Sequence, residues 1–257
     1  MRFVDCEQNS AKWIWARTGR ITASRICDLM ATLKRGGEAA SRRDYRAELI
    51  AERLTGRAED CYVSKEMRSG SEQEPFARTA YEIRTGTMVD QVGFVFHPQL
   101  DFSGASPDGL IGKDGGLELK CPKTTTHLAY MTAGTVPKEY EYQLLWNMAC
   151  TEREWWDFAS FDARLPEKLR LFIVRMSRDE ARIGEIEREV VTLNHEIDTI
   201  CEQLGVVANL VPTEAFAKRG TSKQDLNFKT VQVEEISRAA ELAEVVSKEM
   251  YVEAGRI

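Results

Sequence analysis

The sequence predicts an α/β or α+β fold, in which a central mixed sheet of about five strands is flanked by helices. Apolar residues recur at helical spacing through the first eighty or so residues. Runs rich in β-branched and aromatic residues follow, and residues 112–116 (GKDGG) join two of them as a strong hairpin signal. Helical patterns then return. Helices on both sides of a set of strands are typical of a layered mixed fold.

Each element has a local reason in the sequence. Three of the helices are expected to end at Gly56, Gly86 and Gly205, because glycine commonly follows the last helical turn. In order, helices are expected at residues 13–17, 21–33, 41–55, 71–84, 125–132, 138–150 and 178–204. Strands are expected at residues 88–97, 103–111, 117–121, 155–161 and 169–175.

The character of the sequence shifts after Gly205. Residues 206–228 are polar and irregular, which favours a linker or an extended arm. Residues 233–251 have the apolar spacing of a terminal helix. We therefore expect a core at residues 1–205 and a C-terminal extension at residues 206–257.

The composition is that of an ordinary folded protein, with 43% hydrophobic and 30% charged residues. No apolar run approaches the ~20 residues that span a bilayer, and the N-terminus lacks the apolar core of a signal peptide, so no membrane contact and a cytoplasmic location are expected. The six cysteines show no C-x-x-C spacing, which argues against a zinc site or an iron–sulfur cluster and favours free, mostly buried thiols. Without a G-x-x-x-x-G-K-[ST] loop, no use of ATP is expected.

Charge is distributed unevenly along the chain. The net charge is −6, yet the stretch from Lys12 to Arg57 holds eleven Lys and Arg against five Asp and Glu. Such a local excess suits a groove that grips nucleic acid. A basic helical face is also common on proteins that bind no nucleic acid.

The most informative segment is SPDGLIGKDGGLELKCPK, which begins at Ser106. The hairpin turn folds Asp108 back toward Glu118, and Glu118 and Lys120 share one face because side chains alternate along a strand. Two carboxylates are the oxygen ligands that Mg²⁺ prefers. An exposed hairpin can carry the same residues merely as a solvated face. The interleaved leucines favour a hairpin seated on a core.

Four blocks of sequence resemble, in order, those of the phage-lambda-type exonucleases, the viral recombinase exonuclease family within the restriction-endonuclease-like nucleases. The first has the pattern W-x₃-R-x-G-x-I-T-A-S, from Trp13 to Ser24. The others are GSEQEPFARTAYE, SPDGL with LELKCP, and EYQLLWNM. The resemblance covers roughly residues 5–204 and implies a restriction-endonuclease-like core.

The resemblance implies roles for residues of the hairpin. Asp108 and Glu118 are similar to the family's metal ligands, with the Leu119 carbonyl contributing. Lys120 resembles the residue that positions the attacking water. The implied ion is Mg²⁺, with Mn²⁺ as a substitute, because a hard cation neutralises charge that develops on a phosphodiester.

Further roles follow from the resemblance in the helices. It implies that Glu74 is a catalytic carboxylate and metal ligand, and that Gln143 lies beside the metal or the water. The residue types also allow structural roles, with Glu74 as an exposed helix residue and Gln143 as a brace of the core. Trp13 and Trp15 are better explained by packing than by base stacking. Met67, just before the Glu74 helix, likewise favours packing over a wedge between DNA strands.

A phosphate pocket is implied as well. Arg17, Ser24 and Ser106 resemble the residues that take a 5′-phosphate, and a cationic donor among them suits phosphate oxygens. Either Lys34 or Arg35 adds a further positive charge. Ser24 has the alternative role of a helix cap.

The activity implied by the resemblance is Mg²⁺-dependent 5′→3′ digestion of double-stranded DNA ends, with release of 5′-phosphomononucleotides and a 3′ single strand left for recombination by strand annealing. A ring-shaped homotrimer, a single-strand-annealing partner and a place in the bacterial host cell of a phage or prophage are also implied. The extension would lengthen the DNA channel, brace the oligomer or bind a partner. The rival functions are a restriction-like endonuclease or repair nuclease of different directionality, and a catalytically inactive DNA-binding protein.

Overall fold

The computed structural model describes residues 1–33, 36–58, 65–207 and 210, and of residues 65–71 only the backbone. Lys34, Arg35, the side chain of Met67 and nearly all of the expected extension lie outside the described residues. The chain divides into two units, Met1–Ala217 and Lys218–Ile257, of which the second is outside the described residues. The expected boundary at residue 205 stays a prediction.

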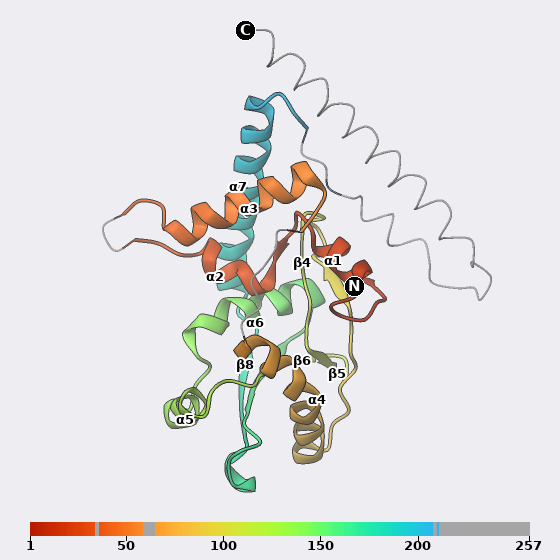
Figure 1. The fold of residues 1–257 in the computed structure, drawn as a ribbon, viewed down its shortest axis with the longest axis vertical. Helices are drawn as coiled ribbons and strands as arrows, with labels where there is room; N and C mark the ends of the chain where they lie inside the picture. The colour runs from red at the N-terminus through yellow and green to blue at the C-terminus, as the bar shows by residue number, and fades with distance from the viewer. Residues whose placement is uncertain (34–35, 59–64, 208–209, 211–257) are drawn as a thin grey trace, which may run out of the picture. The chain divides into compact units, whose positions relative to one another are not determined.

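The described residues form a mixed fold of helices and two sheets, which confirms the predicted fold class (Figure 1). The helices are α1 (Ala11–Arg17), α2 (Ile26–Leu29), α3 (Ala40–Thr55), α4 (Lys65–Thr85), α5 (Thr124–Ala133), α6 (Lys138–Thr151) and α7 (Glu180–Gln203). Short 3₁₀ turns are η1 (Ala23–Arg25) and η2 (Glu167–Leu169). No helix in the described part of the chain combines the length and the apolar character needed to cross a membrane.

The first sheet is small and combines two strands from residues 2–22 with two strands from residues 94–105. Its order is β1-β3-β4-β2, with β2 and β4 parallel and the other pairs antiparallel. The strands are β1 (Arg2–Val4), β2 (Ile21–Thr22), β3 (Phe94–Phe96) and β4 (Ser103–Ala105).

The second sheet carries the predicted hairpin. Its order is β5-β6-β7-β8, with only β6 and β7 parallel. The strands are β5 (Gly109–Ile111), β6 (Gly115–Lys120), β7 (Trp155–Phe161) and β8 (Leu171–Ser177). Since parallel neighbours need a crossover, the chain leaves β6, forms α5 and α6, and returns to β7.

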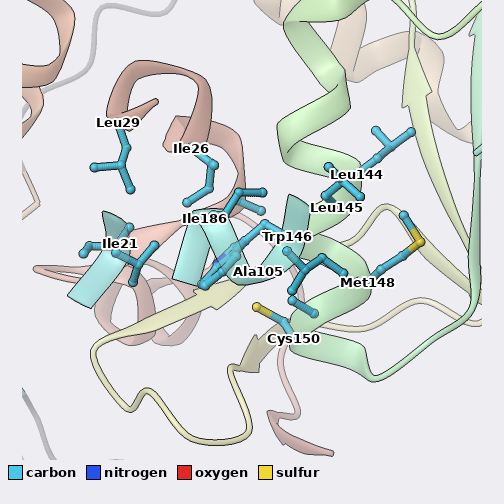
Figure 2. Packing of buried hydrophobic residues seen from close by; sticks show 14 of the residues in the cluster. Ile21, Ile26, Leu29, Ala105, Leu144, Leu145, Trp146, Met148, Cys150 and Ile186 are labelled. Atoms are coloured by element: carbon cyan, nitrogen blue, oxygen red, sulfur yellow. The ribbon is translucent and has the colours of Figure 1, made fainter. Parts of the chain in front are cut away.

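Helix α6 is the centre of the main core. Every residue from Leu144 to Thr151 is buried, and the helix contacts α2, α7, β4 and β6. Figure 2 shows residues of this cluster from β2, α2, β4, α6 and α7, among them Trp146. A second cluster lies between α4 and the sheet, where Ala77 and Tyr81 pack with Leu117 and Leu119. Helix α4 therefore packs on Leu117 and Leu119 of β6, whereas α6 contacts Glu118 of the same strand.

Three expectations from the sequence are corrected by the structure. The helix expected at residues 21–33 is β2, η1 and α2 instead. The backbone N–H of Ile21 donates to Phe102 O and its carbonyl accepts from Ser103 Oγ, so the start of this segment is hydrogen-bonded to residues at the start of β4 and not within a helix. The strand expected at residues 103–111 is divided into β4 and β5, which lie in different sheets. Instead of one sheet of about five strands, the described part of the chain has two sheets of four strands each.

The thiols follow the expectation in part. The five described cysteines are free, but only Cys150 and Cys201 are buried, while Cys27 is exposed. Cys61 lies outside the described residues.

Candidate active site

The β5–β6 hairpin is held in shape by backbone requirements and by one arginine. Gly112 in the turn has a φ of 53°, which favours glycine. Gly116 lies under the ring of Trp156, where a Cβ would come within 2.3 Å of ring carbons. Arg153 Nη1 donates to the carbonyls of Ile111, Gly112 and Gly115 at 3.1, 3.0 and 2.6 Å.

The hairpin brings Asp108 level with Glu118. Gly109 pairs with Leu117, so one step farther along the antiparallel pair Asp108 lies opposite Glu118. The Oδ2 atom of Asp108 accepts a hydrogen bond of 2.7 Å from the backbone N–H of Leu119. Burial, with the negative charges of Glu118 and Glu74, raises the pKa of Asp108 well above its usual range, although Lys120 acts in the opposite direction.

Glu118 is almost fully buried, at 1% exposure, and is surrounded by donors. Its Oε1 accepts from Lys120 Nζ and, at 2.6 Å, from Gln143 Nε2. Its Oε2 accepts from Asn147 Nδ2 at 3.1 Å. A buried carboxylate costs free energy unless it is paired and hydrogen-bonded, so these three donors explain how Glu118 is tolerated.

Lys120 carries its positive charge at the rim of this cluster. Burial lowers the pKa of its ammonium, but the carboxylates of Glu118 and Asp108 outweigh burial and raise that pKa above its usual value. The ammonium also lies 5.1 Å from the ring centroid of Tyr140, a favourable cation–π contact. Lys120 is thus a donor and a fixed charge in this geometry.

Glu74 is half-buried on α4, and its Oε1 accepts a hydrogen bond of 2.8 Å from Arg78. Its charge acts on Asp108 and on Cys121, whose thiol pKa is raised to about 12 by burial and then by Glu74. The structure therefore brings Glu74 within electrostatic reach of the hairpin carboxylates. Its side chain is 35% exposed, so the choice between a site carboxylate and an exposed helix residue stays a prediction.

The donor set fits a hard cation that keeps part of its water shell. Among the described residues, no group of three or more His, Cys, Asp or Glu side chains is arranged to hold a metal ion. Asp108, Glu118 and the Leu119 carbonyl offer oxygen atoms only. Mg²⁺ typically takes one or two carboxylates, with water and substrate phosphate completing its octahedron.

The residues expected to bind phosphate also come together. Arg17 donates to Ser106 Oγ at 2.9 Å and to Ser24 Oγ at 3.5 Å. Trp13 Nε1 donates to the same Ser106 oxygen at 2.9 Å, and the Arg17 guanidinium lies 4.3 Å from a Trp13 ring centroid. Trp13 is also partly buried against the cluster of Val4, Ala16, Phe94 and Phe96, which is consistent with the expected packing role. The alternative of Ser24 as a helix cap is not what is found, because the η1 cap is Thr22.

Several residues of the basic stretch form ion pairs or are buried within the protein. Arg25 pairs with Asp28 and Glu48, and Arg53 is buried, with Nε donating to Gly19 O. Arg42 and Arg46 both pair with Glu38 and with Glu196 on α7. Part of this charge is thus neutralised within the protein, so the count of basic residues does not by itself indicate a groove; that interpretation stays a prediction.

The sequence argument overlooked Asn147 and Arg78. Each lies four residues after a predicted site residue, Gln143 and Glu74 respectively, and side chains four apart share one face of a helix. That spacing was the signal that could have found them.

The chain is similar to proteins of known family and known structure. The YqaJ-like viral recombinase domain matches residues 12–154. The crystal structure of LHK-Exo, an alkaline exonuclease from Laribacter hongkongensis, is 44% identical with a TM-score of 0.71, covering 76% of this chain and 96% of that one. The same protein in complex with dAMP gives 44% identity and a TM-score of 0.70, covering 76% and 98%.

A phage related exonuclease from Haemophilus somnus 129PT shares the fold, at 16% identity and a TM-score of 0.57 over 72% of this chain and 96% of that one. A comparison with curated proteins found no match. The domain match and the similarity to LHK-Exo confirm the resemblance predicted from the four sequence blocks. The chain therefore belongs to the YqaJ-like viral recombinase family.

Proposed function

We propose that the protein is a Mg²⁺-dependent exonuclease that digests the 5′-ended strand of duplex DNA and releases mononucleotides. One observation carries this proposal. Ser106 belongs to the Arg17 cluster and Asp108 to the carboxylate pair, and their Cα atoms are at most about 7 Å apart because only Pro107 lies between them. A terminal phosphate held at Ser106 would leave the adjacent phosphodiester near Asp108.

The phosphate pocket has the donors that such an end requires. Ser106 Oγ accepts from both Arg17 and Trp13, which uses its two lone pairs and directs its own O–H toward a further acceptor. Arg17 brings a guanidinium that matches phosphate oxygens. An endonuclease needs no binding site for the terminal phosphate of a DNA strand. This arrangement therefore supports an enzyme that acts from DNA ends.

The carboxylate cluster has the parts for hydrolysis. Asp108, Glu118 and the Leu119 carbonyl would hold the ion, which when bound neutralises phosphate charge and lowers the pKa of a water ligand. Lys120 would donate to the attacking water or to the phosphate oxygens as charge develops on them. Gln143, which already donates to Glu118, would orient that water or that carboxylate, and Glu74 would complete the site from α4.

The relatives support the substrate and the product class. LHK-Exo is an exonuclease by name, and its complex with dAMP contains a deoxynucleoside monophosphate, the kind of product proposed here. The name of the viral recombinase family supports a place in recombination, in which a 3′ single strand would pass to an annealing protein. We also propose that the protein forms a homotrimeric ring and acts in the cytoplasm of the host cell.

The test is a linear blunt duplex labelled separately at its 5′ and 3′ ends, incubated with Mg²⁺ or with EDTA, with and without a 5′-phosphate. Early release of the 5′ label as mononucleotide, faster with the phosphate and absent in EDTA, is expected. Early loss of the 3′ label would overturn the direction. Cleavage of a closed circular plasmid would indicate an endonuclease instead, and DNA retention without cleavage would indicate a binding protein.

A further inference from the structure

We propose that Asn147 is a positioning residue that orients the carboxylate of Glu118 for its metal ion. This inference rests on the proposed function, because it assigns a role at the same site. Asn147 is fully buried on α6, one turn after Gln143. Its Nδ2 donates to Glu118 Oε2 at 3.1 Å, while Gln143 donates to Oε1 at 2.6 Å.

The two amides hold the two carboxylate oxygens separately. Residues 143 and 147 lie four apart on α6, so their side chains share one face of the helix, which here faces β6. The last torsion of a glutamate is broad and roughly two-fold, so an unanchored carboxylate samples many orientations. With Oε2 held by Asn147 on the buried side, Oε1 is directed toward Lys120, whose side chain is 27% exposed and marks the open side of the site.

Packing alone does not explain an asparagine at this position. Its neighbours on α6 include Trp146, Met148 and Ala149, all buried and apolar. Asn147 Oδ1 is buried and has no hydrogen-bond partner among the described residues. Burying an amide oxygen without a partner costs free energy, and an apolar side chain would avoid that cost. The hydrogen bond to Glu118 offsets this cost. It stabilises a residue of the proposed metal site and not the apolar core.

A fixed carboxylate binds an ion more tightly because less freedom is lost on binding. Outer partners of metal ligands are typically worth about 10–100-fold in metal affinity or activity. We therefore expect the loss of Asn147 to weaken Mg²⁺ binding by about that factor. Turnover at saturating Mg²⁺ should fall much less, since Lys120 and Gln143 remain in place.

The test measures Mg²⁺ binding to the DNA-free full-length protein by titration calorimetry, and the Mg²⁺ concentration for half-maximal cleavage, in Asn147→Ala and Asn147→Val. Valine fills more of the space and decides the result if the alanine variant unfolds. The matched control is Cys150→Ala, which makes a small cavity in the same buried helix and removes none of the hydrogen-bond donors of Glu118. Thermal unfolding checks that all variants are folded.

Weaker Mg²⁺ binding in the Asn147 variants, with wild-type binding in Cys150→Ala, is the expected result. Unchanged Mg²⁺ affinity in a folded Asn147 variant, or an equal loss in Cys150→Ala, would overturn the inference while leaving the proposed nuclease intact. A wild-type protein that neither binds Mg²⁺ nor cleaves DNA would overturn the proposed function itself, so the two failures are distinguishable.

Discussion

Replacing Lys120 by alanine removes the positive charge nearest to the buried Glu118 carboxylate. If Lys120 stabilises charge in the transition state, kcat should fall by about 10²–10³-fold, as expected when one such donor is lost. Cleavage of the end-labelled duplex under saturating Mg²⁺ measures this directly. Lys113→Ala is the matched control, because Lys113 is exposed in the turn of the same hairpin.

The same change should also affect stability in a way that depends on metal. Removing one partner of a buried ion pair costs about 3–5 kcal/mol. The amides of Gln143 and Asn147 still donate to Glu118, so a loss nearer ~1–3 kcal/mol, the cost of one unsatisfied buried polar group, is expected in EDTA. For a chain of this size that lowers Tm by about 2–4 °C per kcal/mol.

Magnesium should restore more stability to Lys120→Ala than to the wild type. In the variant, the ion would replace the positive charge that Lys120 supplies to Asp108 and Glu118, so it should bind more tightly and stabilise the folded state by mass action. Thermal unfolding with and without Mg²⁺ gives the comparison. A variant with wild-type kcat would remove the catalytic assignment of Lys120. Equal stabilisation of both proteins by Mg²⁺ would refute the electrostatic reasoning.

Three other predictions follow from the same contacts. Arg17→Ala should raise KM for 5′-phosphorylated ends by about 10-fold or more, since a charge-assisted bond is worth about 1.5–3 kcal/mol, and should leave 5′-hydroxyl ends unaffected; kinetics on both ends check this. The pKa of Asp108 is raised, so the metal-free fold is most stable when this group is protonated and loses stability as pH rises; Asp108→Asn should therefore raise Tm in EDTA at neutral pH while abolishing cleavage. Burial alone would raise the pKa of Asp162, but hydrogen bonds from Arg164 and Thr124 lower it to about 2. The contribution of Asp162 to the free energy of unfolding is therefore fully present above about pH 4 and is lost toward pH 2. Asp162→Asn should make the free energy of unfolding less dependent on pH over that range, as measured by circular dichroism.

The hairpin could be predicted because its signals are local. Glycines in the turn and alternating leucines fix which side of β6 Glu118 and Lys120 occupy, and the observed register pairs Gly109 with Leu117 accordingly. The approach of Gln143 to Glu118 could not be read from spacing, since it depends on how α6 packs after the crossover. The family resemblance supplied Gln143, and only the packed structure shows what it contacts.

The local excess of basic residues was the least reliable predictor of a binding surface in the sequence. A count along the chain treats each arginine as available to a ligand, whereas Arg46 forms a 2.6 Å bond with Glu196, 150 residues away. Burial gives a second example, because Arg20 is only 2% exposed and burial lowers its pKa to about 10. Partners far apart in sequence decide whether a basic residue faces solvent, so local charge excess predicts a surface only after the fold is known.

The break between β4 and β5 shows why one failed prediction lies at the site itself. A continuous strand over residues 103–111 would place Ser106 and Asp108 on one face of a single sheet. Instead the strand is interrupted at residues 106–108, where the carbonyl of Pro107 accepts from Gln8 Nε2 at 2.8 Å, and β5 enters the second sheet. The interruption lets Ser106 meet Arg17 from α1 while Asp108 meets Leu119 from β6. Irregular backbone is therefore what joins the proposed phosphate pocket to the proposed metal ligands, in keeping with the tendency of local rules to fail at functional sites.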